Sequence, residues 1–257
     1  MKHVKLLFLI AALCFATFSK GQDIWKIQND LDSYYQRVQY WNLRYQLDSA
    51  AKASESLKER LVYYTSTCPA TMKMTFKYLK YYDGLKIYTS NDKSFRIYQW
   101  DDESGATGHN YVTVFQYVIG GEVHSATVLP GSVSQPGSNQ RYKDLYTLKT
   151  ASRVYYLATY AKRFSNNDVF EGIEVFSKDD KNINDSISII KTTLADTAYS
   201  NYGYELFDAK GVTTHSIYFD KRHRTIYFPQ VNKEYMVSSA YVAYKFNGQF
   251  FKEVAIK

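Results

Sequence analysis

The hydrophobic positions of this chain follow two different periods, one in the first 68 residues and another in the rest. From Asp23 to Ser66 apolar side chains recur three or four residues apart, and no glycine or proline interrupts them before Pro69. This spacing places apolar groups on one side of a helix. The stripe consists of Ile24, Ile27, Leu31, Tyr34, Val38, Trp41 and Tyr45. We therefore predict a helical arm over residues 22–68.

A second apolar stripe in this arm is out of phase with the first. It consists of Leu47, Ala50, Ser54, Leu57, Leu61 and Tyr64. The phase shift near residues 46–49 predicts two helices or one bent helix, and Asp48 or Ser49 is the expected cap of the second part. The stripe is short and aromatic, so we expect it to pack on the rest of the protein rather than to form a coiled coil.

After Pro69 the pattern changes to alternation, the period of a half-buried strand. The first predicted strand contains Met72, Met74, Phe76 and Tyr78. Further strand-like runs recur roughly every ten to twelve residues and are bounded by turn signals. They cover residues 94–100, 111–119, 122–129, 153–162, 170–177, 186–191, 202–208, 215–220, 224–228, 239–246 and 249–256.

The joints between these runs indicate how the strands pair. Gly120-Gly121 and Asn247-Gly248 tolerate the positive φ angles of two-residue hairpin turns. Short joints favour antiparallel neighbours, because parallel strands need long crossovers. We predict a mainly β protein in which residues 69–257 form an antiparallel meander of about a dozen strands. The pattern leaves three arrangements open, namely a barrel, a sandwich or a propeller-like stack.

The N-terminus has the three zones of a secretory signal peptide. Lys2 and Lys5 precede an apolar run over Leu6–Phe18, which is too short to span a bilayer comfortably. Small residues then occupy the positions that signal peptidase requires, with Ser19 at −3 and Gly21 at −1. We predict that residues 1–21 are a signal peptide and that the mature chain is exported to the periplasm or the medium.

Removal of this segment leaves 257 − 21 = 236 residues and lowers the formal charge from +7 to +4, since three lysines leave with it. That surplus is small and dispersed, which argues against nucleic-acid binding. The longest basic run, residues 221–224, is interpreted as a solvated turn. The mature chain has no second long apolar stretch and one cysteine, Cys68, so we expect no transmembrane segment and no internal disulfide. We expect a monomer.

Aromatic residues are unusually frequent, with 26 Tyr, 15 Phe and 3 Trp. Their main interpretation is a core in which rings pair across strands. The alternative is an aromatic platform for a sugar or a peptide. Neighbouring residues of a strand point to opposite faces, so we expect one ring of each doublet, Tyr81-Tyr82 and Tyr155-Tyr156, to face solvent.

The stretch WDDESGATGH, residues 100–109, joins two predicted strands and supplies the candidate site residues Trp100, Asp101, Asp102, Glu103 and His109. The favoured interpretation is a connecting loop, in which Asp, Ser and Gly satisfy the backbone of a wide turn. As an alternative, the three carboxylates could bind Ca²⁺, although their spacing is not that of a helix-loop-helix calcium site. A carboxylate and His109 could also form an acid/base pair. We assign no cofactor and no metal ligand.

The longer run SFRIYQWDDESGATGHNYVTVFQY resembles a block found in a family of uncharacterised exported β-rich proteins of Gram-negative bacteria. That block has Ile-Tyr-x-Trp-Asp, then Gly-Gly-Thr-x-His, then Gln-Tyr. This chain departs from it at Ala106, where the second glycine would stand. The matching positions are Ile97, Tyr98, Trp100, Asp101, Gly105, Thr107, His109, Gln116 and Tyr117. The resemblance implies export and a β-rich fold, and it implies no activity.

Common enzyme signatures are absent from the sequence. It contains no Gly-x-Ser-x-Gly, no His-Glu-x-x-His and no Cys-x-x-Cys. We therefore hypothesise a non-catalytic exported protein that binds an envelope or extracellular ligand. The alternative is an extracellular or periplasmic hydrolase that acts on saccharide or another polymer, because the two carboxylates of a glycosidase have no fixed spacing. A third hypothesis is an envelope component that assembles through the helical arm.

Overall fold

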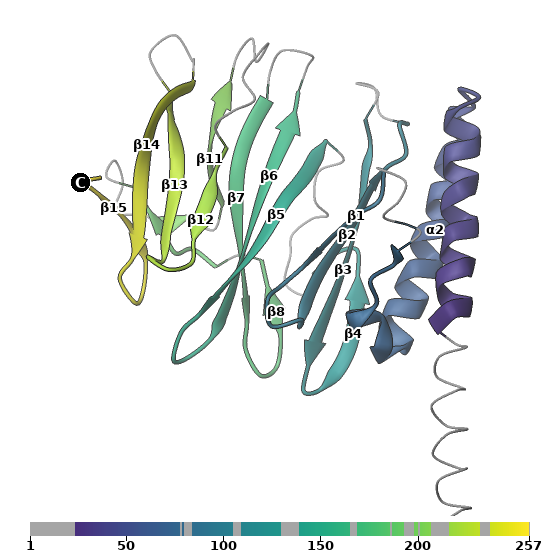
Figure 1. The fold of residues 1–257 in the computed structure, drawn as a ribbon, viewed down its shortest axis with the longest axis horizontal. Coiled ribbons are helices and arrows are strands. Elements are labelled where there is room, and N and C mark those ends of the chain that lie inside the picture. The colour runs from purple at the N-terminus through teal and green to yellow at the C-terminus, as the bar shows by residue number, and fades with distance from the viewer. Residues whose placement is uncertain are drawn as a thin grey trace, which may run out of the picture.

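Two helices and three β-sheets lie side by side in layers (Figure 1). The computed structural model describes residues 24–77, 79, 84–104, 109–129, 139–164, 169–185, 187–192, 198–199, 201–206, 216–231 and 237–256. The predicted signal peptide lies outside these residues.

The helical region forms two antiparallel helices, as the phase shift indicates (Figure 1). The first covers residues 24–42 and the second, α2, covers Leu47–Thr67. Tyr45 separates them with a φ of 55°. Gln46 is the N-cap of α2 and makes no side-chain cap bond, so the predicted cap at Asp48 or Ser49 is wrong. Neither described helix contains a segment apolar enough to cross a bilayer.

A polar contact joins the two helices on their less buried side. Asp30 Oδ2 accepts hydrogen bonds from Arg60 Nε at 2.6 Å and from the Tyr64 hydroxyl at 2.8 Å. Burial opposes ionisation of Asp30, but these two donors outweigh it and hold the pKa of its carboxyl below the ordinary value. The two bonds that Asp30 accepts, from Arg60 and from Tyr64, therefore fix the register in which the helices pack.

The first sheet is a four-stranded antiparallel meander in the order β1-β2-β3-β4. Its strands are β1 Lys86–Thr89, β2 Phe95–Asp101, β3 Tyr111–Ile119 and β4 Glu122–Ala126. Gly120 and Gly121 turn the chain between β3 and β4 with φ angles of 59° and 87°. The two-residue hairpin predicted there is confirmed.

The second sheet has the order β11-β7-β6-β5, with β8 paired to β7. Its strands are β5 Gln140–Lys149, β6 Val154–Arg163, β7 Val169–Lys178, β8 Ile183–Asn184 and β11 Asn201–Leu206. The terminal sheet has the order β10-β9-β15-β14-β13-β12 and includes one parallel pair, β15 with β9. Its strands are β9 Ile190–Lys191, β10 Ala198–Tyr199, β12 Tyr218–Asp220, β13 Thr225–Val231, β14 Val237–Phe246 and β15 Phe251–Val254.

Three hydrophobic cores lie between the four layers (Figure 1). The helices meet the first sheet around Leu31, Leu57 and Trp100. The first and second sheets meet around Phe95 and Tyr156, whose ring centroids are 4.9 Å apart. The core between the second and terminal sheets contains Leu157, Val175, Phe228 and Phe251. The mainly β prediction is confirmed, and of its three arrangements a sandwich-like stack fits, since the described strands close no barrel.

The second sheet is buried on both faces, which explains one wrong expectation. Tyr155 contributes to the core with the terminal sheet, and Tyr156 contributes to the core with the first sheet. Both rings are buried, so neither ring of this doublet faces solvent. Tyr81-Tyr82 lies outside the described residues.

The strand predicted from Met72 to Tyr78 does not form in its described part. Residues 69–73 form a 3-10 helix instead, and Phe76 has a φ of 47°, which an extended strand does not allow. The buried Arg96 guanidinium donates to the carbonyl oxygens of Thr71 at 2.6 Å and Met74 at 2.7 Å. It therefore satisfies backbone groups that would otherwise need a neighbouring strand.

Other differences follow from local geometry. The alternation misses β5 because a register shift between Tyr142 and Asp144 breaks its period. It also misses the short strand β1, and it overestimates the run at 186–191, where only Ile190 and Lys191 pair. The predicted Asn247-Gly248 turn is one residue off. Phe246 pairs with Phe251 and Asn247 N donates to Phe250 O, so Gly248 and Gln249 form the tip.

Buried amides join the first sheet to the second. The Gln99 side chain donates from Nε2 to Gln140 O at 2.8 Å and accepts at Oε1 from Tyr142 N at 2.8 Å. The Gln99 side chain thus bonds to the β5 backbone in the way that a neighbouring strand would, next to the register shift between Tyr142 and Asp144. Glu174 Oε2 accepts from the Tyr142 hydroxyl at 2.8 Å and from Gln140 Nε2 at 3.2 Å. The Gln99 bonds therefore join the first sheet to the second, and the Glu174 bonds hold Gln140 and Tyr142 in place within the second sheet.

We predict that Arg96→Met lowers the free energy of unfolding by about 3 kcal/mol, because two backbone carbonyls lose their buried donor. Urea denaturation measures the change. Arg222→Met, on the exposed turn after β12, is the control and should leave stability within about 0.5 kcal/mol of the wild type. Equal stabilities for Arg96→Met and the wild type would contradict the assignment.

We predict that Glu174→Gln stabilises the protein at pH 7. Burial raises the pKa of the Glu174 carboxyl, and the negative charge of Asp185 raises it further. The hydrogen bond from Tyr142 lowers this pKa but does not outweigh the other two effects. A raised pKa in the folded state means that wild-type stability increases as pH falls through that pKa towards the ordinary value of about 4.3. The advantage of Glu174→Gln should therefore shrink on acidification. Denaturation between pH 7 and 4 tests this, with the exposed Glu59→Gln as control; a constant difference would refute it.

Candidate functional site

Trp100 is part of the core rather than of the loop surface. Its side chain is only 1% exposed, and its indole Nε1 donates to Ser54 Oγ on α2 at 2.8 Å. The residue therefore fastens the end of β2 to the helical layer. In this position it supports the neighbouring loop and is not accessible to a ligand.

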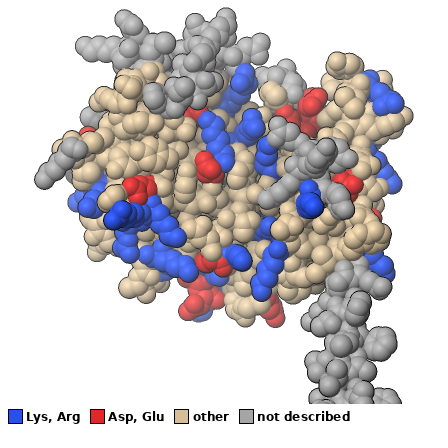
Figure 2. Space-filling view, viewed as in Figure 1, with Lys and Arg blue, Asp and Glu red and all other residues tan. Residues whose placement is uncertain are grey.

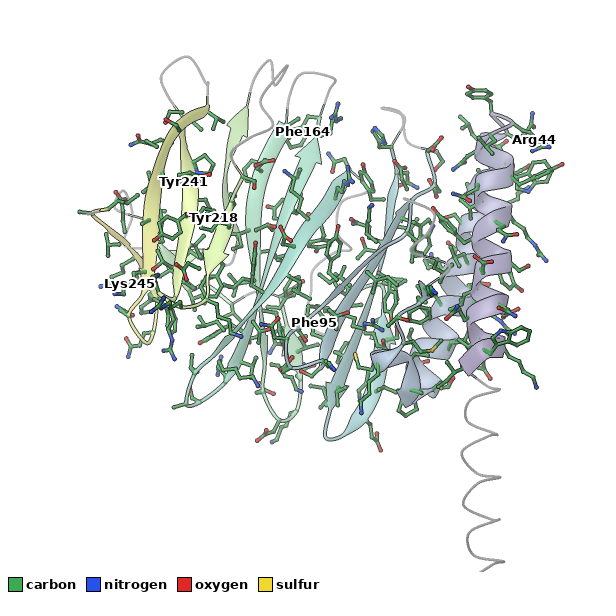
Figure 3. The ribbon with its side chains drawn as sticks, in the orientation of Figure 1. Arg44, Phe95, Phe164, Tyr218, Tyr241 and Lys245 are labelled. Atoms are coloured by element: carbon green, nitrogen blue, oxygen red, sulfur yellow. The ribbon has the colours of Figure 1, made fainter. Side chains whose placement is uncertain are left out.

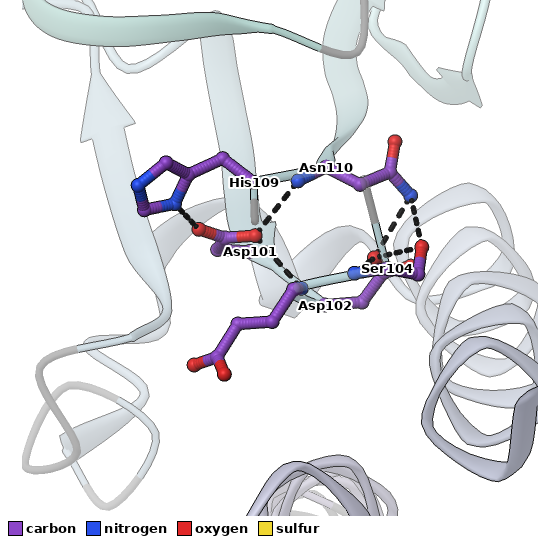
Figure 4. A network of polar contacts seen from close by, with 6 residues as sticks. Asp101, Asp102, Ser104, His109 and Asn110 are labelled. Atoms are coloured by element: carbon purple, nitrogen blue, oxygen red, sulfur yellow. Dashed lines mark hydrogen bonds and ion pairs between the residues drawn. The ribbon is translucent and has the colours of Figure 1, made fainter. Parts of the chain in front are cut away.

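Asp101 ends β2 and organises the loop that follows (Figure 4). Its Oδ1 accepts hydrogen bonds from the backbone N–H groups of Glu103 at 2.8 Å and Asn110 at 2.9 Å. Its Oδ2 pairs with Nδ1 of His109. Both oxygens thus bind groups of the loop, and the two ends of the loop are closed on this one side chain.

Asp102 also accepts hydrogen bonds from other groups of the loop, and it is more buried than Asp101. Its Oδ1 accepts from Ser104 Oγ at 2.6 Å, Ser104 N at 3.1 Å and Asn110 Nδ2 at 2.8 Å (Figure 4). The sequence singled out the carboxylates but not Asn110, which contacts both of them. Asn110 could have been suspected, since Asp, Ser and Asn side chains commonly bond to nearby backbone in turns. Residues 105–108 lie outside the described part of the chain.

Glu103 and His109 are the more accessible members of the candidate set. Glu103 adopts a φ of 58° and is exposed. The His109 side chain is 42% exposed and its ring stacks on Tyr111, with centroids 5.8 Å apart. Because Asp101 holds Nδ1, the ring orientation is fixed and Nε2 is the nitrogen left for proton transfer. The structure therefore brings together the pair that acid/base chemistry needs.

A polar cleft of about 340 Å³ opens between α2 and the ends of β2 and β3. Its described walls include Asp102, Ser104 and Asn110 on the loop side and Ser54 and Lys58 on α2. Lys58 is paired with Glu55 at 2.5 Å. The volume and polar walls would suit a small polar ligand. His109 and Asp101 do not line this cleft, so the loop faces two separate sides.

The described residues contain no group of three or more His, Cys, Asp or Glu side chains arranged to hold a metal ion. Asp101 already uses both carboxylate oxygens, and Asp102 uses Oδ1 three times. A Ca²⁺ ion bound here would have to replace these bonds. The loop therefore already uses the Asp101 carboxylate and Asp102 Oδ1, whereas the exposed Glu103 carboxylate takes no part in these bonds.

A second candidate surface lies on the outer face of the terminal sheet (Figure 3). Tyr218 and Tyr227 are cross-strand partners, and their rings stack with centroids 4.8 Å apart and an interplanar angle of 12°. The Tyr241 ring packs edge-on against both, at 5.5 Å and 6.3 Å. Tyr218 is 40% exposed. We call these three residues the tyrosine face.

The register of the terminal sheet shows which residues share this face, although Ala243 there is only 3% exposed. Ala243 and Val254 continue the row of Tyr218 and Tyr227 across β14 and β15, by their backbone pairing. The next row along the strands carries Lys245 and Lys252, which also pair with each other. Polar hydrogen-bonding groups thus border an aromatic surface. The sequence contains this alternation, but it does not show which face of the sheet is left uncovered.

No family model, curated protein or solved structure matches this chain. The resemblance to exported β-rich proteins therefore stays a prediction. The loop network, the polar cleft and the tyrosine face are the observations on which a function can rest.

We predict that the thermal unfolding midpoint is the same in EDTA and in millimolar Ca²⁺, because the loop satisfies its own carboxylates. Scanning calorimetry of the purified protein measures it. The Asp101→Asn/Asp102→Asn variant is the matched comparison, and it should unfold at a lower temperature in both buffers. A Ca²⁺-dependent rise in the wild type that the variant lacks would instead identify a calcium site, since a ligand of the native state raises the transition.

Proposed function

We propose that this protein is an exported, non-catalytic binding protein that holds a saccharide chain on its tyrosine face. Export rests on the predicted signal peptide, and binding rests on the geometry of the terminal sheet. The observation that carries the proposal is the stacked, partly exposed row formed by Tyr218 and Tyr227, with Tyr241 packed against them.

The position of this row in the stack supports a binding role. The helices and the second sheet cover the two faces of the first sheet, and its neighbours cover the second sheet. The outer face of the terminal sheet is where the layering ends. Tyr218 is 40% exposed, and its ring stacks on that of Tyr227, so this pair forms an aromatic surface that a partner can contact.

The chemistry of the row favours a saccharide. One face of a sugar ring presents C–H groups, which stack on aromatic rings, while its edges present hydroxyl groups. Tyrosine combines an apolar ring with a polar tip, and Lys245 and Lys252 lie in the adjacent row, where their ammonium groups can donate hydrogen bonds to hydroxyl oxygens. The 4.8 Å separation of Tyr218 and Tyr227 follows the spacing of strands.

The hydrolase alternative rests on a different observation, the Asp101–His109 pair. The carboxylate orients the imidazole as in acid/base enzymes, and the ring is partly exposed. However, both Asp101 oxygens also close the loop, and the polar cleft does not include His109. This pair is therefore better explained as loop architecture.

We predict that Tyr218→Ala and Tyr241→Ala each weaken saccharide binding about tenfold, because each removes a ring worth about 1 kcal/mol or more in stacking. A glycan array selects the ligand, and isothermal titration calorimetry measures its affinity. The matched control is Tyr63→Ala. Tyr63 is 54% exposed on α2, at the opposite end of the stack, and its loss should leave affinity unchanged.

Two outcomes would contradict the proposal. Equal losses in Tyr63→Ala and Tyr218→Ala would show that the tyrosine face is not the binding surface. Release of new reducing ends during titration, abolished by His109→Ala, would show a hydrolase and move the function to the loop.

A further inference from the structure

A second cleft lies on the rim of the stack, where turns from all three sheets converge. Its volume is about 340 Å³. The first sheet contributes the β1–β2 turn, the second sheet the end of β5, and the terminal sheet the β12–β13 turn. The lining residues are Asn91, Asp92, Thr147, Leu148, Lys149, Lys221 and Arg224. We call it the rim cleft.

The charge of the rim cleft is predominantly positive. Lys149, Lys221 and Arg224 reach it from two different sheets, and the one acidic lining residue is Asp92. None of the three cations forms an ion pair with a residue of the described ranges. Figure 2 shows basic side chains gathered over the lower part of the terminal sheet, the end at which this turn lies.

Asp92 keeps its negative charge, but it is bonded to neutral donors and forms no ion pair with these cations. Its Oδ1 accepts from Ser90 Oγ at 2.6 Å and from Ser94 N at 3.3 Å. Its Oδ2 accepts from the Tyr156 hydroxyl at 3.1 Å. Asp92 thus closes the β1–β2 turn and ties it to the second sheet.

The backbone that carries the cations is fixed. Asp220 Oδ1 accepts from Arg222 N at 2.8 Å and from His223 N at 3.1 Å, which closes the β12–β13 turn. Arg224 O accepts from Phe246 N at 2.9 Å. On the other wall, Asn91 N donates to Thr147 Oγ1 at 3.0 Å. The basic groups therefore stand on preformed turns, which lowers the ordering cost of binding.

We propose that the rim cleft binds a phosphate- or sulfate-type oxyanion. Two lysines and an arginine around one cavity provide charge-assisted donors, and the guanidinium fork matches the geometry of such anions. The lining carries a formal charge of 3 − 1 = +2, the complement of a doubly charged anion. The site is independent of the proposed saccharide surface, so either proposal can fail alone.

The test is isothermal titration of inorganic phosphate, inorganic sulfate and glycerol 3-phosphate into the purified protein. We expect saturable one-site binding that Lys221→Gln/Arg224→Gln weakens at least about tenfold, through loss of two charged donors. Arg222→Gln/Lys73→Gln removes the same charge from exposed positions outside the cleft, and it should retain affinity. Circular dichroism checks that both variants remain folded. Lys149→Gln provides a second lining variant if the turn variant unfolds.

Each possible result of these titrations supports or contradicts the proposed anion site. Tighter binding of glycerol 3-phosphate than of inorganic phosphate would assign the site to an ester carried on a larger molecule, and equal binding would assign it to the free anion. If the lining variant and the control variant lost anion affinity equally, the binding would depend only on the net charge of the protein, and the proposal would be overturned. Absence of saturable binding for all three probes would overturn it as well. Tyr218→Ala should bind phosphate normally, which separates this result from the saccharide test.

Discussion

The structure depends on one constraint, which is that the first and second sheets are each buried on both faces. A sheet in this position needs apolar side chains at consecutive positions, as Tyr155 and Tyr156 show. Tyrosine meets the need because its ring fills the core while its hydroxyl can reach a polar partner, as Tyr98 reaches Gln116 Oε1 at 2.8 Å. The layering therefore accounts for the buried tyrosines of these sheets, such as Tyr98, Tyr142 and Tyr160.

The same burial requires that every polar group between layers find a partner. Gln116 donates from Nε2 to Thr65 O and Thr71 Oγ1, and so links the first sheet to the end of α2. Gln99 links the first sheet to β5 in the same way. Several positions of the block that resembles exported β-rich proteins thus have structural roles. Trp100, Tyr98 and Gln116 hold the layers together, and Asp101 and His109 close a loop.

Surfaces for ligands then occur where stacking ends. The tyrosine face lies on the outer side of the last sheet, and the rim cleft lies where segments of three sheets converge. The acidic loop, the most conspicuous motif of the sequence, is instead occupied by its own hydrogen bonds. A cluster of polar residues in the sequence is therefore a poor guide to a binding site in this chain. A turn uses the same residue types, Asp, Ser and Asn, to bond to its own backbone.

The sequence by itself determined many of the elements, although not β1, β5 or the segment that follows Pro69. Its helical stripes, its alternating runs and the Gly120-Gly121 hairpin are local patterns, and local backbone preferences suffice to produce them. Only the tertiary structure decided which faces are covered. Alternation shows that two sides of a strand differ, but not what packs on each side, so it could not show that Tyr156 is buried and Tyr218 exposed. It likewise could not show that Arg96, distant in sequence, satisfies the carbonyls of Thr71 and Met74 and replaces a predicted strand. Those outcomes depend on contacts between distant segments, which no local pattern encodes.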